Sequence, residues 1–150
     1  IGQMLGAGRS EEEVRDTDRK LIVTSVLSCL VFALLMSAAS GIFPQIYNTT
    51  DEVRDLATWL ICISAVMMPF NSFTNATYFT LRSGGQTMVT FLFDSCFVWG
   101  VCIPLAYCLS RFTSLPILPL FAICQGTDLI KCMIGAFMLK QGKWIQNLTA

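Results

Sequence analysis

The charged residues inside the apolar stretches of this chain are its best candidates for chemistry. They are two carboxylates, Asp94 and Asp128, and one ammonium group, Lys131. A charge inside a long apolar helix is costly, so it either pairs with an opposite charge or serves a function. Asp128 and Lys131 are three residues apart and can pair on one helical face. Asp94 has no cationic residue within four positions, so we expect it to anchor a helix or to bind a cation.

The pair of Asp128 and Lys131 has two interpretations. We favour a silent ion pair that only holds the helix in place. A carboxylate in apolar surroundings can also load and release a proton, so Asp128 remains, with Asp94, a candidate for coupling or gating. Gln125 lies three residues before Asp128 and Trp99 five residues after Asp94, and both are further candidates for substrate or cation binding.

A stripe of polar side chains recurs on one face of a predicted helix. Its spacings of 7, 4, 3 and 4 residues match helical periodicity, and its members are Ser64, Asn71, Asn75, Tyr78 and Arg82. Pro69 lies within the same helix, where it removes a backbone hydrogen bond and favours a bend. The stripe predicts either the lining of a pocket or hydrogen bonds that join neighbouring helices.

The residue types needed for enzymatic or metal chemistry are absent from the sequence. The chain has no His, and its 7 Cys lie in apolar stretches without a CxxC pair. It has no phosphate-binding loop and no nucleophile beside a base. We interpret the Cys residues as small apolar side chains and expect no enzyme, no metal site and no cofactor. Lys+Arg and Asp+Glu are equal at 10 each, so the net charge points to no nucleic-acid partner, and we expect none.

Four long stretches with almost no charge must position these residues. There is no charged residue between Lys20 and Asp51 or between Asp55 and Arg82. The two stretches that follow hold only the three charged residues named above. Each stretch exceeds the roughly 20 residues that an apolar helix needs to cross a bilayer. The sequence therefore predicts an all-α membrane protein with four transmembrane helices, at about residues 21–46, 52–81, 87–109 and 117–140.

Shorter polar segments flank these helices. Residues 1–20 are predicted to be the tail of a preceding helix followed by a loop, and residues 141–150 a C-terminal tail. Ser10 and Glu13 have the spacing of a capping box, which also favours a helix start near Glu11. Arg82, Gly84 and Gly85 form a predicted tight turn.

The basic residues are distributed unevenly between the two sides of the predicted bundle. The side with both chain ends carries seven Lys and Arg residues, while Arg54 and Arg111 are on the other side. Cytoplasmic segments of membrane proteins are enriched in Lys and Arg. We therefore expect both ends in the cytoplasm.

Four segments form an ordered set of motifs. They are Gly2-Gln3-Met4-Leu5-Gly6-Ala7-Gly8-Arg9 with the acids at 11–13, Leu81-Arg82-Ser83-Gly84-Gly85-Gln86-Thr87, the run from Asp94 through Trp99 to Ile103-Pro104-Leu105-Ala106, and Lys131 with the ending Gly142-Lys143-Trp144-Ile145-Gln146-Asn147-Leu148-Thr149. In order and spacing, these motifs resemble those of the multidrug and toxic compound extrusion (MATE) family. The ending is similar to that of clostridial members, and the resemblance covers essentially all 150 residues.

The resemblance implies a fold and a function. The four helices would be the last four of twelve, in a protein whose two six-helix lobes rock around a central cavity. Such transporters export drugs and other amphipathic organic cations in exchange for Na⁺ or H⁺ across a bacterial cell membrane. The implied partners are the lipid bilayer, the remaining helices and these substrates. The chain does not begin with Met, and we interpret it as a C-terminal fragment that does not transport alone.

The resemblance also implies a coupling acid that this sequence lacks. Several members carry a carboxylate in the third-last helix, and the matching position lies near Ser72. Asp94 or Asp128 would have to substitute, or the coupling site lies in the other lobe. Two alternatives to an exporter are a flippase for lipid-linked precursors, which would have an Arg-rich cavity, and a relic or helical subunit that does not transport.

Overall fold

The computed structural model describes residues 1–145, apart from the side chain of Phe93. Of the predicted tail at 141–150, residues 146–150 lie outside the described part of the chain. The described part is helical, and its long helices are α2 (Glu11–Ala39), α3 (Asp51–Ser83), a helix over Thr87–Phe112 and α6 (Ile117–Gln141). All four are long and apolar enough to cross a membrane. The predicted fold class, an all-α membrane protein, is confirmed.

The helix over Thr87–Phe112 is not regular α-helix throughout. It begins as α4 (Thr87–Phe91) and ends as α5 (Ile103–Phe112). Between them lie two π-helical segments, η2 (Leu92–Cys96) and η3 (Val98–Cys102). Two short elements complete the fold, namely α1 (Gly2–Gly6) and the 3-10 helix η1 (Phe43–Ile46).

The first long helix lies earlier in the chain than the predicted 21–46. The predicted loop before it is helical from Glu11 onward, because Ser10 accepts a hydrogen bond from the Glu13 amide at 3.4 Å and three acids occupy the first turn. The helix ends at Ala39, and Pro44 begins a separate 3-10 turn, since proline cannot continue the hydrogen-bond pattern of an α-helix. Ser10 therefore caps the helix near the predicted start at Glu11, while the Glu13 carboxylate contacts Arg9 and does not complete a capping box.

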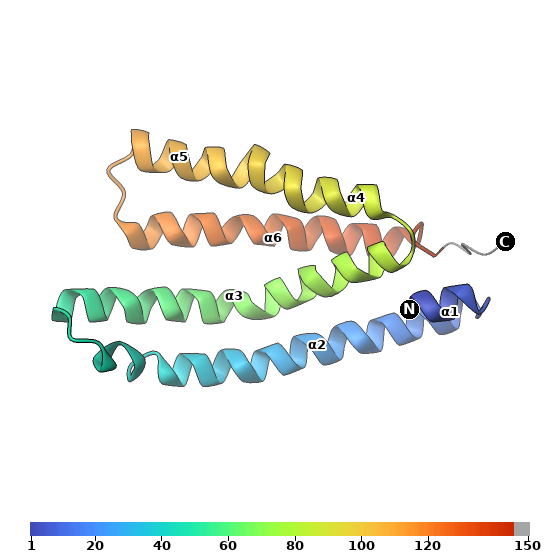
Figure 1. Ribbon diagram of the computed structural model, residues 1–150, viewed down its shortest axis with the longest axis horizontal. Helices are drawn as coiled ribbons and strands as arrows, with labels where there is room; N and C mark the ends of the chain where they lie inside the picture. Colours follow the sequence, from blue (N-terminus) through green and yellow to red (C-terminus); the bar gives the residue numbers. More distant parts are fainter. Residues whose placement is uncertain (146–150) are drawn as a thin grey trace.

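The helices form two antiparallel hairpins that lie side by side (Figure 1). Helix α3 packs against α2 on one side and against α6 on the other, and α5 lies beyond α6. The N-terminus, the α3–α4 turn and the end of α6 lie at one end of the bundle (Figure 1). Helix α3 bends in its middle (Figure 1), and Pro69 is the proline inside it.

Polar side chains join α2 to α3. The Thr80 hydroxyl donates to the Asp18 carboxylate at 2.5 Å, and the Ser25 and Ser72 hydroxyls share a hydrogen bond at 2.9 Å. Asp18, Ser72 and Thr80 are all buried. Because hydrocarbon offers no hydrogen-bond partner, such groups bond across the helix–helix contact. These two bonds fix which faces of α2 and α3 meet.

A small apolar cluster closes the end of the bundle that holds the N-terminus and the end of α6. Leu5, Val14, Leu81 and Trp144 are each buried. A Cβ atom on Gly84 would overlap the carbonyl oxygen of Trp144, and Gly85 has φ +85°, so the predicted turn at Arg82, Gly84 and Gly85 requires its glycines. The cluster binds the α3–α4 turn to the segment that follows α6.

The contact between α3 and α6 is closest at Gly135. A Cβ atom on Gly135 would lie 3.0 Å from the Cγ2 methyl of Thr77, which is fully buried. Small residues let helix backbones approach in this way. Gly135 lies seven residues after Asp128 and four after Lys131 on the same helix, so this contact sets the separation between those side chains and α3.

We predict that Gly135→Val lowers the unfolding free energy in detergent by about 1–3 kcal/mol, because the added methyl groups overlap Thr77. The matched control is Gly126→Val on the same helix, where a Cβ atom would meet nothing within 4 Å. The measurement is the denaturant midpoint of both variants. Equal midpoints for the two variants would contradict a close contact at Gly135.

Candidate functional site

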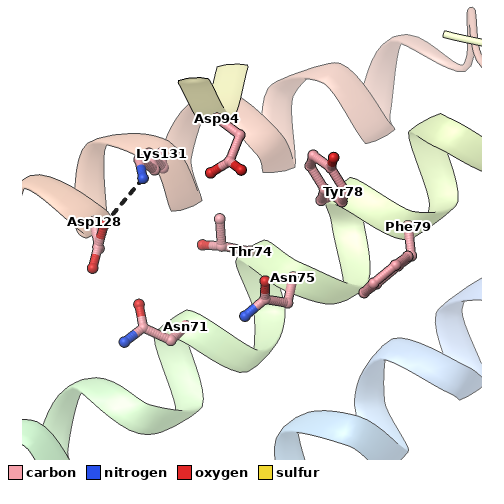
Figure 2. Close-up of a pocket in the computed structure, with 8 residues that line it drawn as sticks. All are labelled: Asn71, Thr74, Asn75, Tyr78, Phe79, Asp94, Asp128 and Lys131. Atoms are coloured by element: carbon pink, nitrogen blue, oxygen red, sulfur yellow. Dashed lines mark ion pairs between the residues drawn. The ribbon is translucent and has the colours of Figure 1, made fainter. Parts of the chain in front are cut away.

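A cavity of about 370 Å³ lies between α3, α6 and the helix over Thr87–Phe112. Eight residues line it, and Figure 2 shows them: Asn71, Thr74, Asn75, Tyr78, Phe79, Asp94, Asp128 and Lys131. Six of the eight were candidates from the sequence. Thr74 and Phe79 were not. Thr74 follows Asn71 by three residues, so it lies on the same face as the polar stripe. This spacing could have identified it as a lining residue.

Helix α3 supplies one wall of the cavity. Asn71 and Asn75 point into the gap between α3 and α6 (Figure 2). Neither amide has a hydrogen-bond partner among residues 1–145, so both are free to contact a ligand. Tyr78 makes an edge-to-face contact with Phe79, with the ring centroids 5.6 Å apart. This wall therefore offers amide groups and aromatic rings together.

Helix α6 supplies an ion pair to the opposite wall. Lys131 Nζ lies 3.5 Å from an Asp128 carboxylate oxygen, which confirms the pairing predicted from their spacing (Figure 2). The same ammonium lies 5.2 Å from the centroid of the Phe97 ring. Lys131 is buried, and its charge is balanced by the carboxylate of Asp128 together with the face of the Phe97 ring.

Asp94 is the unpaired charged residue among those that line the cavity. It lies in the π-helical segment η2, and its carboxylate points into the gap between α3 and α6 (Figure 2). Within the described part of the chain it has no hydrogen-bond or ion-pair partner. π-Helical turns inside α-helices are frequent at functional sites. With both acids ionised, the cavity formally carries one net negative charge, which favours a cationic ligand.

The remaining sequence candidates lie outside this cavity. Ser72 faces α2, where it bonds to Ser25. The Trp99 side chain is 73% exposed on the outer surface of its helix. Gln125 is half-buried on α6 but does not line the cavity. The structure thus gathers Asn71, Asn75 and Tyr78 of the polar stripe with Asp94 and the ion pair. Ser64 and Arg82, the two ends of the stripe, do not line the cavity.

We predict that Lys131→Met destabilises the protein by about 3 kcal/mol, because it leaves Asp128 half-buried without its counter-ion. The double variant Asp128→Asn/Lys131→Met removes both charges and should regain most of this loss. The free energy of unfolding in detergent micelles measures both. A double variant as unstable as Lys131→Met would show that the ion pair does not govern stability.

Comparison with protein families gave one match. The MatE family model matches residues 1–108, which include α1, α2, α3 and most of the helix over Thr87–Phe112. The matched range includes the α3 wall of the cavity and Asp94, and it ends before α6. No curated protein and no solved structure matches the chain.

Proposed function

Because this chain belongs to the MatE family of membrane transporters, we propose that it is part of a cation-coupled exporter of amphipathic organic cations. The family comprises transporters and not enzymes, which agrees with the expectation from the sequence. The chain is a multi-pass membrane protein. The coupling ion and the class of substrate are part of what we propose.

The observation that carries the proposal is the unpaired carboxylate of Asp94. It faces a cavity in which the ammonium of Lys131, the one cation among the described lining residues, is already paired with Asp128. A cationic ligand would gain an ionic contact with Asp94 without displacing an existing partner. The rings of Tyr78 and Phe79 add surfaces that attract organic cations, and the amides of Asn71 and Asn75 add neutral acceptors.

Exchange would follow from competition for one carboxylate. A proton or Na⁺ on Asp94 removes the charge that holds an organic cation, and the organic cation in turn excludes the ion. Two ligands that bind one site exclusively are coupled in both directions. Asp94 would thus take the role of the acid missing near Ser72, whose side chain bonds to α2 instead of facing the cavity.

The proposed transporter is larger than these four helices. We propose that these helices are the C-terminal part of a twelve-helix protein of clostridial type in a bacterial cell membrane. Asn75 and Asp94 are exposed, so the cavity opens at the surface of the four helices. Polar side chains on such an opening are suited to face water or further helices, and not lipid.

A flippase for lipid-linked precursors is less compatible with this lining. A pocket for phosphate groups would favour several unpaired cationic side chains, and Arg above all. The eight lining residues include no Arg, and their single Lys is paired with Asp128. A non-transporting relic remains an alternative outcome of the transport assay below.

We predict that Asp94→Asn in the whole protein lowers ion-driven efflux of a cationic dye by at least about tenfold, because a charge-assisted contact is lost. The measurement is efflux of ethidium from cells or proteoliposomes under an imposed Na⁺ or H⁺ gradient. Glu52→Gln is the control, since Glu52 is exposed at the start of α3 and far from the cavity. Unchanged efflux and ion dependence in Asp94→Asn would remove Asp94 from the mechanism.

The orientation has its own test. In a variant without native Cys, an impermeant maleimide added outside intact cells should label Ser114→Cys and not Gln141→Cys. Ser114 lies in the exposed α5–α6 connection and Gln141 at the exposed end of α6. The reverse pattern would place both described chain ends outside the cell and overturn the orientation inferred from the basic residues.

A further inference from the structure

A second hollow, separate from the cavity at Asp94, lies where α2 begins and α6 ends. This groove of about 560 Å³ shares no lining residue with that cavity. Its lining changes character along its length. Arg15, Arg19 and Lys140 lie at the charged end, while Ile22, Val23 and Phe73 continue toward the middle of the bundle.

The three basic side chains of the groove are unpaired. Other basic residues near the start of α2 are in ion pairs, since Arg9 contacts Glu13 at 3.4 Å and Lys20 contacts Asp16 at 2.6 Å. Arg15, Arg19 and Lys140 have no hydrogen bond or ion pair with any residue among 1–145. They are therefore available for an anionic ligand.

The guanidinium of Arg15 spans the groove from α2 to α6. Its Nη2 atom would lie 2.8 Å from a Cβ atom placed on Gly142, the residue that ends α6. Lys140 is two residues earlier on α6. Cationic groups from two helices thus border the same opening.

The acids of the groove do not cancel this charge. Asp16 is paired with Lys20, and the Asp18 carboxylate is buried and accepts the Thr80 hydroxyl. Glu12 has no partner in the described structure, and the neutral Thr80 hydroxyl does not offset the charge of Asp18. Counted formally, three unpaired cations against these two acids leave one net positive charge.

The apolar part of the groove continues from the charged part into the membrane. Ile22 and Val23 lie one turn after Arg19, at the start of the charge-free stretch of α2. Trp144 also lines the groove, and its indole N–H donates to the Leu139 carbonyl at 3.3 Å. The cationic side chains of α2 lie directly before its charge-free stretch, so we expect them at the depth of lipid phosphates.

We propose that this groove binds an anionic phospholipid, with its phosphate between Arg15, Arg19 and Lys140 and an acyl chain along Ile22, Val23 and Phe73. Basic pockets between transmembrane helices on the cytoplasmic side suit such headgroups. A free phosphate would leave the apolar wall unused. The choice of leaflet depends on the proposed orientation, but the binding does not depend on the transported substrate.

The test is native mass spectrometry of the whole protein in detergent, titrated with phosphatidylglycerol or with phosphatidylcholine of the same acyl chains. Phosphatidylglycerol should be retained in preference. Arg15→Gln/Arg19→Gln should weaken its binding roughly 30-fold, from the contribution of each basic side chain near an anionic surface. The control Arg9→Gln/Arg82→Gln makes the same change in charge at exposed residues near the same end of the bundle that do not line the groove, and it should weaken binding less than about threefold.

Three results would overturn the proposal. Equal retention of phosphatidylglycerol and phosphatidylcholine by the unsubstituted protein would overturn it. This result does not depend on whether the variants fold. Equal weakening in the two double variants would reduce the effect to general surface charge. Inorganic phosphate that displaces phosphatidylglycerol at equal concentration would show that the site recognises phosphate alone, without an acyl chain.

Discussion

Hydrocarbon offers no hydrogen-bond partners, so each polar group within these helices must find a partner in the protein or face a ligand. Within the charge-free stretches, the α2–α3 contact meets this demand with the Ser25–Ser72 hydrogen bond. Helix α6 meets it with the Asp128–Lys131 ion pair. Asn71, Asn75 and Asp94 have no partner in the described structure, and all three line one cavity. The buried Thr77 hydroxyl also lacks a partner, but it lies at the close contact with Gly135 and not in the cavity. The candidate site is thus the place where three unpartnered polar side chains come together.

Helix α3 organises the structure because its two faces have different tasks. Ser72 and Thr80 bind it to α2, while Asn71 and Tyr78 face the cavity. The close approach of Gly135 to Thr77 holds α6 near the second face. The proline-associated bend lies between the two halves of α3, so a change at the bend would alter the cavity and the α2 contact together.

The two hollows have opposite charge and suit different ligands. The cavity at Asp94 has an excess negative charge, aromatic rings and free amides, a combination suited to organic cations. The groove at Arg15 has excess positive charge and an apolar wall that continues along α2. Because the chain belongs to the MatE family, we propose a transport role for the cavity at Asp94. A lipid in the second would hold the start of α2 against the end of α6.

The sequence by itself determined the fold class, the four apolar helices, the polar stripe of α3 and the pairing of Asp128 with Lys131. All of these follow from local periodicity and from the lengths of charge-free runs. It also determined the cap at Ser10. The apolar run alone placed the start of the transmembrane helix near residue 21, whereas the helix begins at Glu11. Only the tertiary structure decided that Ser72 faces α2, that Trp99 and Gln125 lie outside the cavity, and that Asp94 meets the α3 stripe. Spacing shows which residues of one helix share a face, but which helix packs against that face depends on contacts distant in sequence, such as Gly135 with Thr77.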